Sequence, residues 1–161
     1  MEAFQLNKDI VPPRLELAFE AQVEVGSVLP IGASASVTRR TVPILGGTVC
    51  GPRVCGIIRT GGADWQFVRP DGLIDLDAQY LIETDDGVLI EVRNKGIRFG
   101  PPEVLARLAA GEAVAPDEYY FRTAPRFFAP DGRYEWLRES IFVATGERYA
   151  DRVTIQVWRV L

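Results

Sequence analysis

The chain has 161 residues, of which 47% are apolar and 25% are charged, and its formal net charge is −4. This length and balance fit one globular domain and exclude general disorder, a collagen-like repeat and a coiled coil. We interpret residues 1–13 as a polar N-terminal arm and residues 14–161 as a single β-barrel domain.

Two absences restrict the chemistry. The chain has no histidine, which removes imidazole bases, the Ser-His-Asp triad and His-bearing metal sites. Cys50 and Cys55 cannot close a zinc site alone, and we interpret them as small buried residues rather than as a disulfide. The usual glycine-rich nucleotide-binding motifs are also missing. We therefore predict no metal and no cofactor.

The charges and apolar runs indicate which partners to expect. No more than two basic residues stand in a row, and no apolar run approaches the ~18 residues of a membrane span. The N-terminus does not resemble a signal peptide. We expect a small-molecule ligand, no nucleic acid, no membrane and a cytoplasmic location. Arginine supplies 16 of the 18 basic residues, which reflects either coding bias or a preference for carboxylate ligands.

The chain is rich in strand patterns. Apolar and polar residues alternate over residues 15–25, which predicts a long, half-exposed strand. Further short strand-like runs follow, separated by Gly, Asp and Pro turns, at residues 54–59, 65–69, 78–83, 88–94, 119–123, 141–144 and 153–160. Such regular spacing predicts an antiparallel sandwich or barrel. The exception is a short helix around residues 102–110, bounded by prolines and Gly111.

The first candidate site is the run Gly61-Gly62-Ala63-Asp64-Trp65-Gln66. An Asp beside a Trp at a barrel mouth could be a desolvated carboxylate with a raised pKa, and hence a general acid or base. The alternative is a hairpin in which Asp64 caps backbone amides and Trp65 fills core.

The second candidate site is the strand around Tyr120 and Arg122. Alternation puts these two side chains on one face, where a hydroxyl beside a guanidinium could hold a carboxylate or phenolate. We place this face inside the barrel, opposite Asp64. The alternative is an aromatic strand with an Arg that extends to solvent.

Further candidate ligand contacts lie on a predicted hairpin and on a later loop. Asn94 continues the apolar face of the second hairpin strand, so it is either a strand cap or a ligand contact, and Arg93 adjoins it. Tyr80 lies on the first hairpin strand. Glu135 and Trp136 form an acid–aromatic pair whose alternative is a surface Glu beside a core Trp.

Several motifs stand in an order that resembles one family. They are Gly46-Gly47 with Gly51-Pro52, Gly61–Gln66, Asp86-Gly87, Asn94-x-Gly96-x-Arg98, Tyr120–Thr123 and Tyr134-x-Trp136-Leu137. They resemble the bacterial and fungal family called domain of unknown function 3237. That resemblance implies a closed, lipocalin-like antiparallel barrel with an interior cavity, often as a homodimer. It also implies a link to catabolism of lignin-type aromatics, including cofactor-free removal of carboxyl groups.

Two functions remain open. The first is a cofactor-independent lyase or isomerase, decarboxylase-like, acting on a small aromatic or oxygenated organic acid. Asp64 would move the proton, Tyr120 and Arg122 would bind the acid, Trp65 would stack on the ring and Asn94 would donate to a developing oxyanion. The second is a non-catalytic small-molecule binder of lipocalin type. A buried Asp64 with a raised pKa favours the enzyme, and one occupied with backbone amides favours the binder.

Overall fold

The computed structural model describes residues 5–161, so the first four residues of the predicted arm lie outside the described part. The strands are β1 (Leu15–Val25), β2 (Leu29–Ala33), β3 (Thr38–Cys50), β4 (Cys55–Ile58), β5 (Gly62–Val68), β6 (Ile74–Thr84), β7 (Leu89–Phe99), β8 (Tyr120–Phe128), β9 (Ile141–Arg148) and β10 (Arg152–Val160). The helical elements are α1 (Pro102–Ala109) and the 3-10 turns η1 (Pro116–Glu118) and η2 (Glu135–Leu137).

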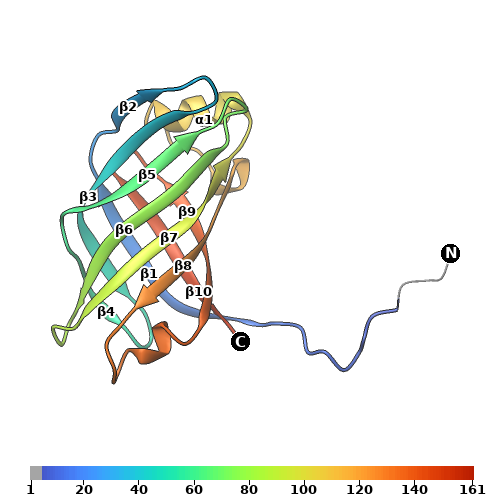
Figure 1. The fold of residues 1–161 in the computed structure, drawn as a ribbon, viewed down its shortest axis with the longest axis vertical. Helices are drawn as coiled ribbons and strands as arrows, with labels where there is room; N and C mark the ends of the chain where they lie inside the picture. The colour runs from blue at the N-terminus through green and yellow to red at the C-terminus, as the bar shows by residue number, and fades with distance from the viewer. Residues whose placement is uncertain (1–4) are drawn as a thin grey trace.

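The sheet closes on itself as an antiparallel barrel (Figure 1). Its order is β1-β10-β9-β8-β7-β6, then β4 and β5 end to end between β6 and β3, and β3 pairs with β1 to close the barrel. Because β4 and β5 succeed one another along the same neighbours, the barrel has eight strand positions. The predicted closed, mainly β barrel with one short helix near residues 102–110 is confirmed.

The strand β3 was not predicted, because Pro43 and the Gly46-Gly47 pair within it are typical of turns. Its first part, Thr38–Ile44, pairs with β5, and its last part pairs with β4 and β1. Gly46-Gly47 therefore marks the point where one long strand changes partners. Through these successive pairings β3 connects β4 and β5 to β1 and so closes the barrel.

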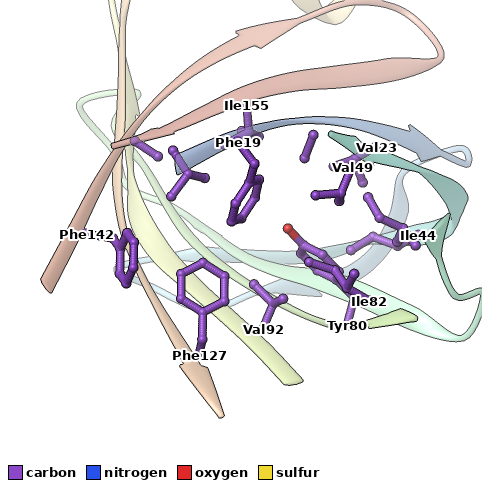
Figure 2. Packing of buried hydrophobic residues seen from close by; sticks show 14 of the residues in the cluster. Phe19, Val23, Ile44, Val49, Tyr80, Ile82, Val92, Phe127, Phe142 and Ile155 are labelled. Atoms are coloured by element: carbon purple, nitrogen blue, oxygen red, sulfur yellow. The ribbon is translucent and has the colours of Figure 1, made fainter. Parts of the chain in front are cut away.

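The two ends of the barrel differ. The helix α1 lies over one end, beside β2, and η2 lies at the opposite end (Figure 1). Near η2 the interior is aromatic: the ring centroid of Phe127 lies 5.7 Å from that of Phe19 and 5.1 Å from that of Phe142. Figure 2 shows these rings at one side of the core and Tyr80 and Ile44 at the other. Aromatic side chains therefore fill much of the barrel interior near η2.

The interpretation of Cys50 and Cys55 as buried residues was wrong, whereas the strand predicted over residues 15–25 is confirmed as β1, with one break in its alternation. Cys50 is exposed and Cys55 is half-buried, because both lie at the hairpin that joins β3 to β4; they are free, with their sulfur atoms 2.7 Å apart. In β1 the pairing shifts between Leu17 and Phe19, so Leu17 stays exposed and Ala18 is buried. Across residues 5–161, no helix has the length and hydropathy needed to span a bilayer.

Candidate functional site

The barrel interior contains a small cavity at the end nearer α1. Its volume is about 50 Å³, and its wall is mostly aliphatic. Its polar lining residues are Asp64, Gln66, Tyr80, Asn94, Arg98, Thr123 and Arg148. This volume holds a few water molecules but no aromatic acid, because ligand pockets usually measure ~300–1,000 Å³.

A larger space lies directly above this cavity, at the barrel mouth beneath α1. It measures about 740 Å³ and is lined by Leu105 and Leu108 of α1 and by Arg40 of β3. Arg98 and Arg148 line both the mouth and the inner cavity. The two spaces together have room for a small organic molecule, with its body in the mouth and its reacting end toward the cavity.

Asp64 is the acid of the inner cavity. It lies in β5, and its carboxylate accepts hydrogen bonds from Gln66 Nε2 to Oδ2 at 2.6 Å and from the backbone N–H of Asp77 to Oδ1 at 2.9 Å. Burial raises the pKa of Asp64; the hydrogen bonds and the charge of Arg98 oppose this only in part. A carboxyl group of this kind can exchange a proton nearer to neutral pH than an ordinary Asp.

Gln66 links this acid to the basic residues of the mouth. It is buried two positions beyond Asp64 on the same face of β5, and its Oε1 accepts a hydrogen bond from Arg40 Nε at 2.8 Å. The amide is therefore fixed from both sides, with its Nε2 donating to Asp64. This bridge sets the orientation of the carboxyl group.

Arg98 is the most unusual residue of the site. It is 8% exposed, and within residues 5–161 its guanidinium makes no hydrogen bond or salt bridge; its nearest aromatic contact is Phe121, at 5.7 Å from the ring centroid. Burial, and then the charges of Arg148 and Arg40, lower the pKa of Arg98 to about 10, so it stays protonated at neutral pH. The charge of Asp64 favours the cation only in part, and a buried cation without a salt bridge is stabilised further when an anion binds.

Two further polar atoms in the cavity have no partner among the described residues. They are Oδ1 of Asn94 and Oγ1 of Thr123, and both residues are buried. Tyr80 is also buried, with its hydroxyl turned into the barrel (Figure 2), and burial raises the pKa of its phenol. An unsatisfied buried polar atom costs about 1–3 kcal/mol, which ligand or water contacts would offset.

The prediction that Tyr120 and Arg122 lie inside the barrel was wrong. Tyr120 is 50% exposed, Arg122 is exposed, and the Nη1 of Arg122 donates to the carbonyl of Phe121 at 2.9 Å. The inward face of β8 carries Phe121 and Thr123 instead. The full strand contains the reason: the face of Tyr120 also carries Arg126, whereas the opposite face has no charge.

The other predicted residues divide between the inside and the outside. Asn94 and Tyr80 line the cavity together with Asp64. Trp65 is 43% exposed and points outward, and Arg93 forms an outer salt bridge with Asp77 at 3.0 Å, so neither reaches the cavity.

Glu135 and Trp136 lie in η2, at the packed end of the barrel, and not at the cavity. The carboxylate of Glu135 accepts the backbone N–H of Gly132 at 3.2 Å, while Trp136 is buried against Phe142. Their sequence neighbourhood does not bring them near Asp64, since η2 covers the opposite end (Figure 1).

Arg98, Thr123 and Arg148 at the cavity and Arg40 at the mouth were not predicted to contact a ligand, and Gln66 was noted only as part of the Gly61–Gln66 run, without a role. For Arg98 a signal existed, because Asn94, Gly96 and Arg98 continue the inward alternation of β7. Gln66 shares the face of Asp64 in the same way. Arg40 and Arg148 carried no signal, since only barrel closure brings β3 and β9 to this mouth.

Comparison with known proteins places these features in a family. The model of the family described as "Protein of unknown function (DUF3237)" matches residues 13–160. A UPF0311 protein of Rhodopseudomonas palustris is 45% identical over 151 residues, which cover 92% of this chain and 99% of that protein. A hydroalkoxylation enzyme of Penicillium herquei is 35% identical over 81 residues, covering 50% of this chain and 54% of the enzyme.

Solved structures show the same barrel. A protein of unknown function from Rhodopseudomonas palustris has a TM-score of 0.89 at 43% identity, with 94% of this chain and all (100%) of that chain covered. A beta-barrel like protein from Acinetobacter baumannii has a TM-score of 0.83 at 36% identity, with 96% and 100% covered. An enzyme from Penicillium herquei shares the fold at 24% identity, with a TM-score of 0.72 and 97% and 100% covered. From the family match and these relatives, the chain belongs to the DUF3237 family.

Proposed function

We propose that the protein is a cofactor-independent lyase or isomerase that acts on a small aromatic or oxygenated organic acid, with Asp64 as the proton-transfer group. The observation that carries this proposal is that the carboxyl group of Asp64 lines a cavity together with Arg98, which forms no salt bridge within residues 5–161; burial there raises the pKa of Asp64. Active sites are where such perturbed acids gather.

The chemistry follows from the position of Asp64. In an isomerisation the ionised carboxylate takes a proton from one substrate carbon and returns it to another. In a decarboxylation the C–C bond to the carboxylate breaks, CO₂ leaves, and protonated Asp64 gives its proton to the electron pair left on carbon; water then reprotonates Asp64. Three residues that line the cavity are able to orient the substrate. Oδ1 of Asn94 and Oγ1 of Thr123 have no partner among the described residues, and Arg98 forms no salt bridge there.

One relative supports this class of reaction. The Penicillium herquei relative is named a hydroalkoxylation enzyme. Hydroalkoxylation adds an O–H group across a carbon–carbon double bond, so a proton passes from oxygen to carbon. A barrel that provides one general acid–base group and an oriented substrate suffices for that step.

The experiment begins with the ligand. Mass spectrometry of small molecules that remain bound through purification, followed by a panel of hydroxylated aromatic acids, would identify a substrate. The expected result is turnover that Asp64→Asn lowers by on the order of a hundredfold or more while binding persists. Glu91→Gln, an exposed carboxylate on the outer face of β7, is the matched control. Equal turnover in the Asp64 variant and the wild type would refute the assignment.

A second function has one observation in its favour. Oδ1 of Asp64 accepts the backbone N–H of Asp77, so part of its bonding capacity serves the fold, as in a non-catalytic small-molecule binder. Ligand binding that no panel compound converts to product would favour that function. The homodimer and the cytoplasmic location stay predictions; light scattering on the purified protein would test the first.

A further inference from the structure

Three arginines meet at the barrel mouth with one acid among them. Arg40, Arg98 and Arg148 line the space beneath α1, and the nearest carboxyl groups are Asp64 and, for Arg148, the exposed Asp151. Within residues 5–161 none of these three arginines forms a salt bridge. The cluster therefore keeps an excess of about two positive charges when Asp64 is ionised.

The same three arginines act on one another. The charges of Arg148 and Arg40 disfavour the cationic form of Arg98, and Arg40 does the same to Arg148. Their hydrogen bonds go to neutral groups: Arg40 to the Gln66 amide at 2.8 Å and Arg148 to the Arg152 carbonyl at 3.4 Å. Three like charges held near a single carboxyl group, Asp64, repel one another, and a bound anion would relieve that repulsion.

The remaining lining of the mouth is apolar. Leu105 and Leu108 come from α1, and Val68 and Ile74 come from the adjoining barrel rim. A ligand that fits this lining has an apolar body, and inorganic anions lack one. The mouth therefore has a cationic side and an apolar side.

We propose that this mouth is a binding site for an organic dianion, an apolar or aromatic molecule bearing two carboxylates. The two carboxylates of the ligand bind Arg98, Arg148 and Arg40, and its apolar part packs against α1. This rests on the proposed function and narrows its substrate class from an organic acid to a dicarboxylate. One guanidinium can take a carboxylate in two parallel hydrogen bonds, and three guanidiniums exceed what a single carboxylate can neutralise.

The test measures affinity by calorimetry for the three benzene dicarboxylates, each beside its monomethyl and dimethyl esters, with inorganic phosphate as a further probe. The expected result is binding of at least one dicarboxylate roughly tenfold or more tighter than its monoester. Arg98→Met should weaken that binding by about thirtyfold or more and remove the preference, and Arg148→Met should do the same to a smaller degree. Arg122→Met, on the outer face, should keep the wild-type affinities.

A second measurement separates a ligand site from a structural role. Without ligand, Arg98→Met should leave the melting temperature unchanged or raise it, because the variant removes an unpaired buried charge. A clear fall in the melting temperature of the free variant would mean that Arg98 supports the fold and would overturn the proposal. So would equal affinity for diacid and monoester, no binding of any dicarboxylate, or phosphate binding as tight as the best dicarboxylate.

These outcomes separate this proposal from the proposed function. Preferential dicarboxylate binding without turnover would uphold the dianion site and count against the enzyme. Alternatively, an uncharged or monoanionic compound is turned over, and this turnover is abolished by Asp64→Asn but unchanged in Arg98→Met. That result would uphold the enzyme and count against the dianion site.

Discussion

At the scale of single residues, the site depends on how burial competes with hydrogen bonding at Asp64. Burial disfavours the carboxylate, while donation from Gln66 and from the Asp77 backbone favours it, and burial dominates. The residue is thus kept oriented without being locked in the ionised state. A single neighbour, Gln66, therefore influences both the pKa and the orientation of the Asp64 carboxyl group.

Gln66→Met should raise the pKa of Asp64 further, because the variant removes the donor to Oδ2 that stabilises the ionised form. If ionised Asp64 is the base, the acidic limb of the pH–rate profile should move to higher pH, with a smaller effect at high pH. Gln22→Met, on the outer face of β1, should leave the profile unchanged. An unshifted limb in the Gln66 variant would show that this amide does not tune Asp64.

Asp64 also couples stability to pH. Its folded-state pKa is raised above the unfolded value of about 3.9, so ionisation costs free energy of folding. That cost is absent below pH ~3.9 and complete above the folded-state pKa. Asp64→Asn should therefore gain stability relative to the wild type as the pH rises through this window, as measured by urea unfolding at several pH values. A constant difference across the window would contradict the raised pKa.

At the scale of elements, β3 decides whether the sheet can close. Gly47 has a φ of +135°, and a Cβ there would lie 2.0 Å from the backbone oxygen of Gln22 in β1. The β1–β3 pairing, which closes the barrel, requires this close approach of the two backbones. The glycine pair that is typical of a turn is in fact required within a strand.

Gly47→Ala should therefore destabilise the protein by several kcal/mol, more than the ~1 kcal/mol of a typical substitution, because strain at positive φ adds to a clash with backbone. Gly26→Ala is the matched control, since its Cβ would meet only side chains, at 3.6 Å. Thermal or urea unfolding of both variants measures the difference. Equal stability of the Gly47→Ala and Gly26→Ala variants would mean that β1 and β3 can accommodate a Cβ at residue 47 without a cost in stability.

At the scale of the whole molecule, the barrel divides into a packed end and an open end. The rings of Phe19, Phe127, Phe142 and Trp136 fill the end under η2, while polar side chains surround the cavity below α1. Packing supplies stability at one end, and unsatisfied polar groups are concentrated at the other. The aromatic packing at one end therefore offsets the destabilising effect of the unsatisfied polar groups at the other.

Phe142→Ala should lower the free energy of unfolding by about 3–5 kcal/mol, because the residue is 2% exposed and packs against two other rings. The affinity for a ligand of the mouth should stay close to that of the wild type at a temperature where the variant is folded. Val143→Ala, on the outer face of the same strand, should cost far less. A large loss of affinity in the Phe142 variant would show that the two ends are coupled.

The sequence determined the strand-rich class, the helix near residues 102–110 and the inward position of Asn94, because these follow from local alternation and turn chemistry. The predicted inward face of β8 was wrong, since Tyr120 and Phe121 are both aromatic and only the continuation to Arg126 separates the two faces. The arginine cluster was decided by tertiary structure alone. Arg40 and Arg148 lie 108 positions apart, and only closure of the sheet brings their strands to one mouth with Arg98.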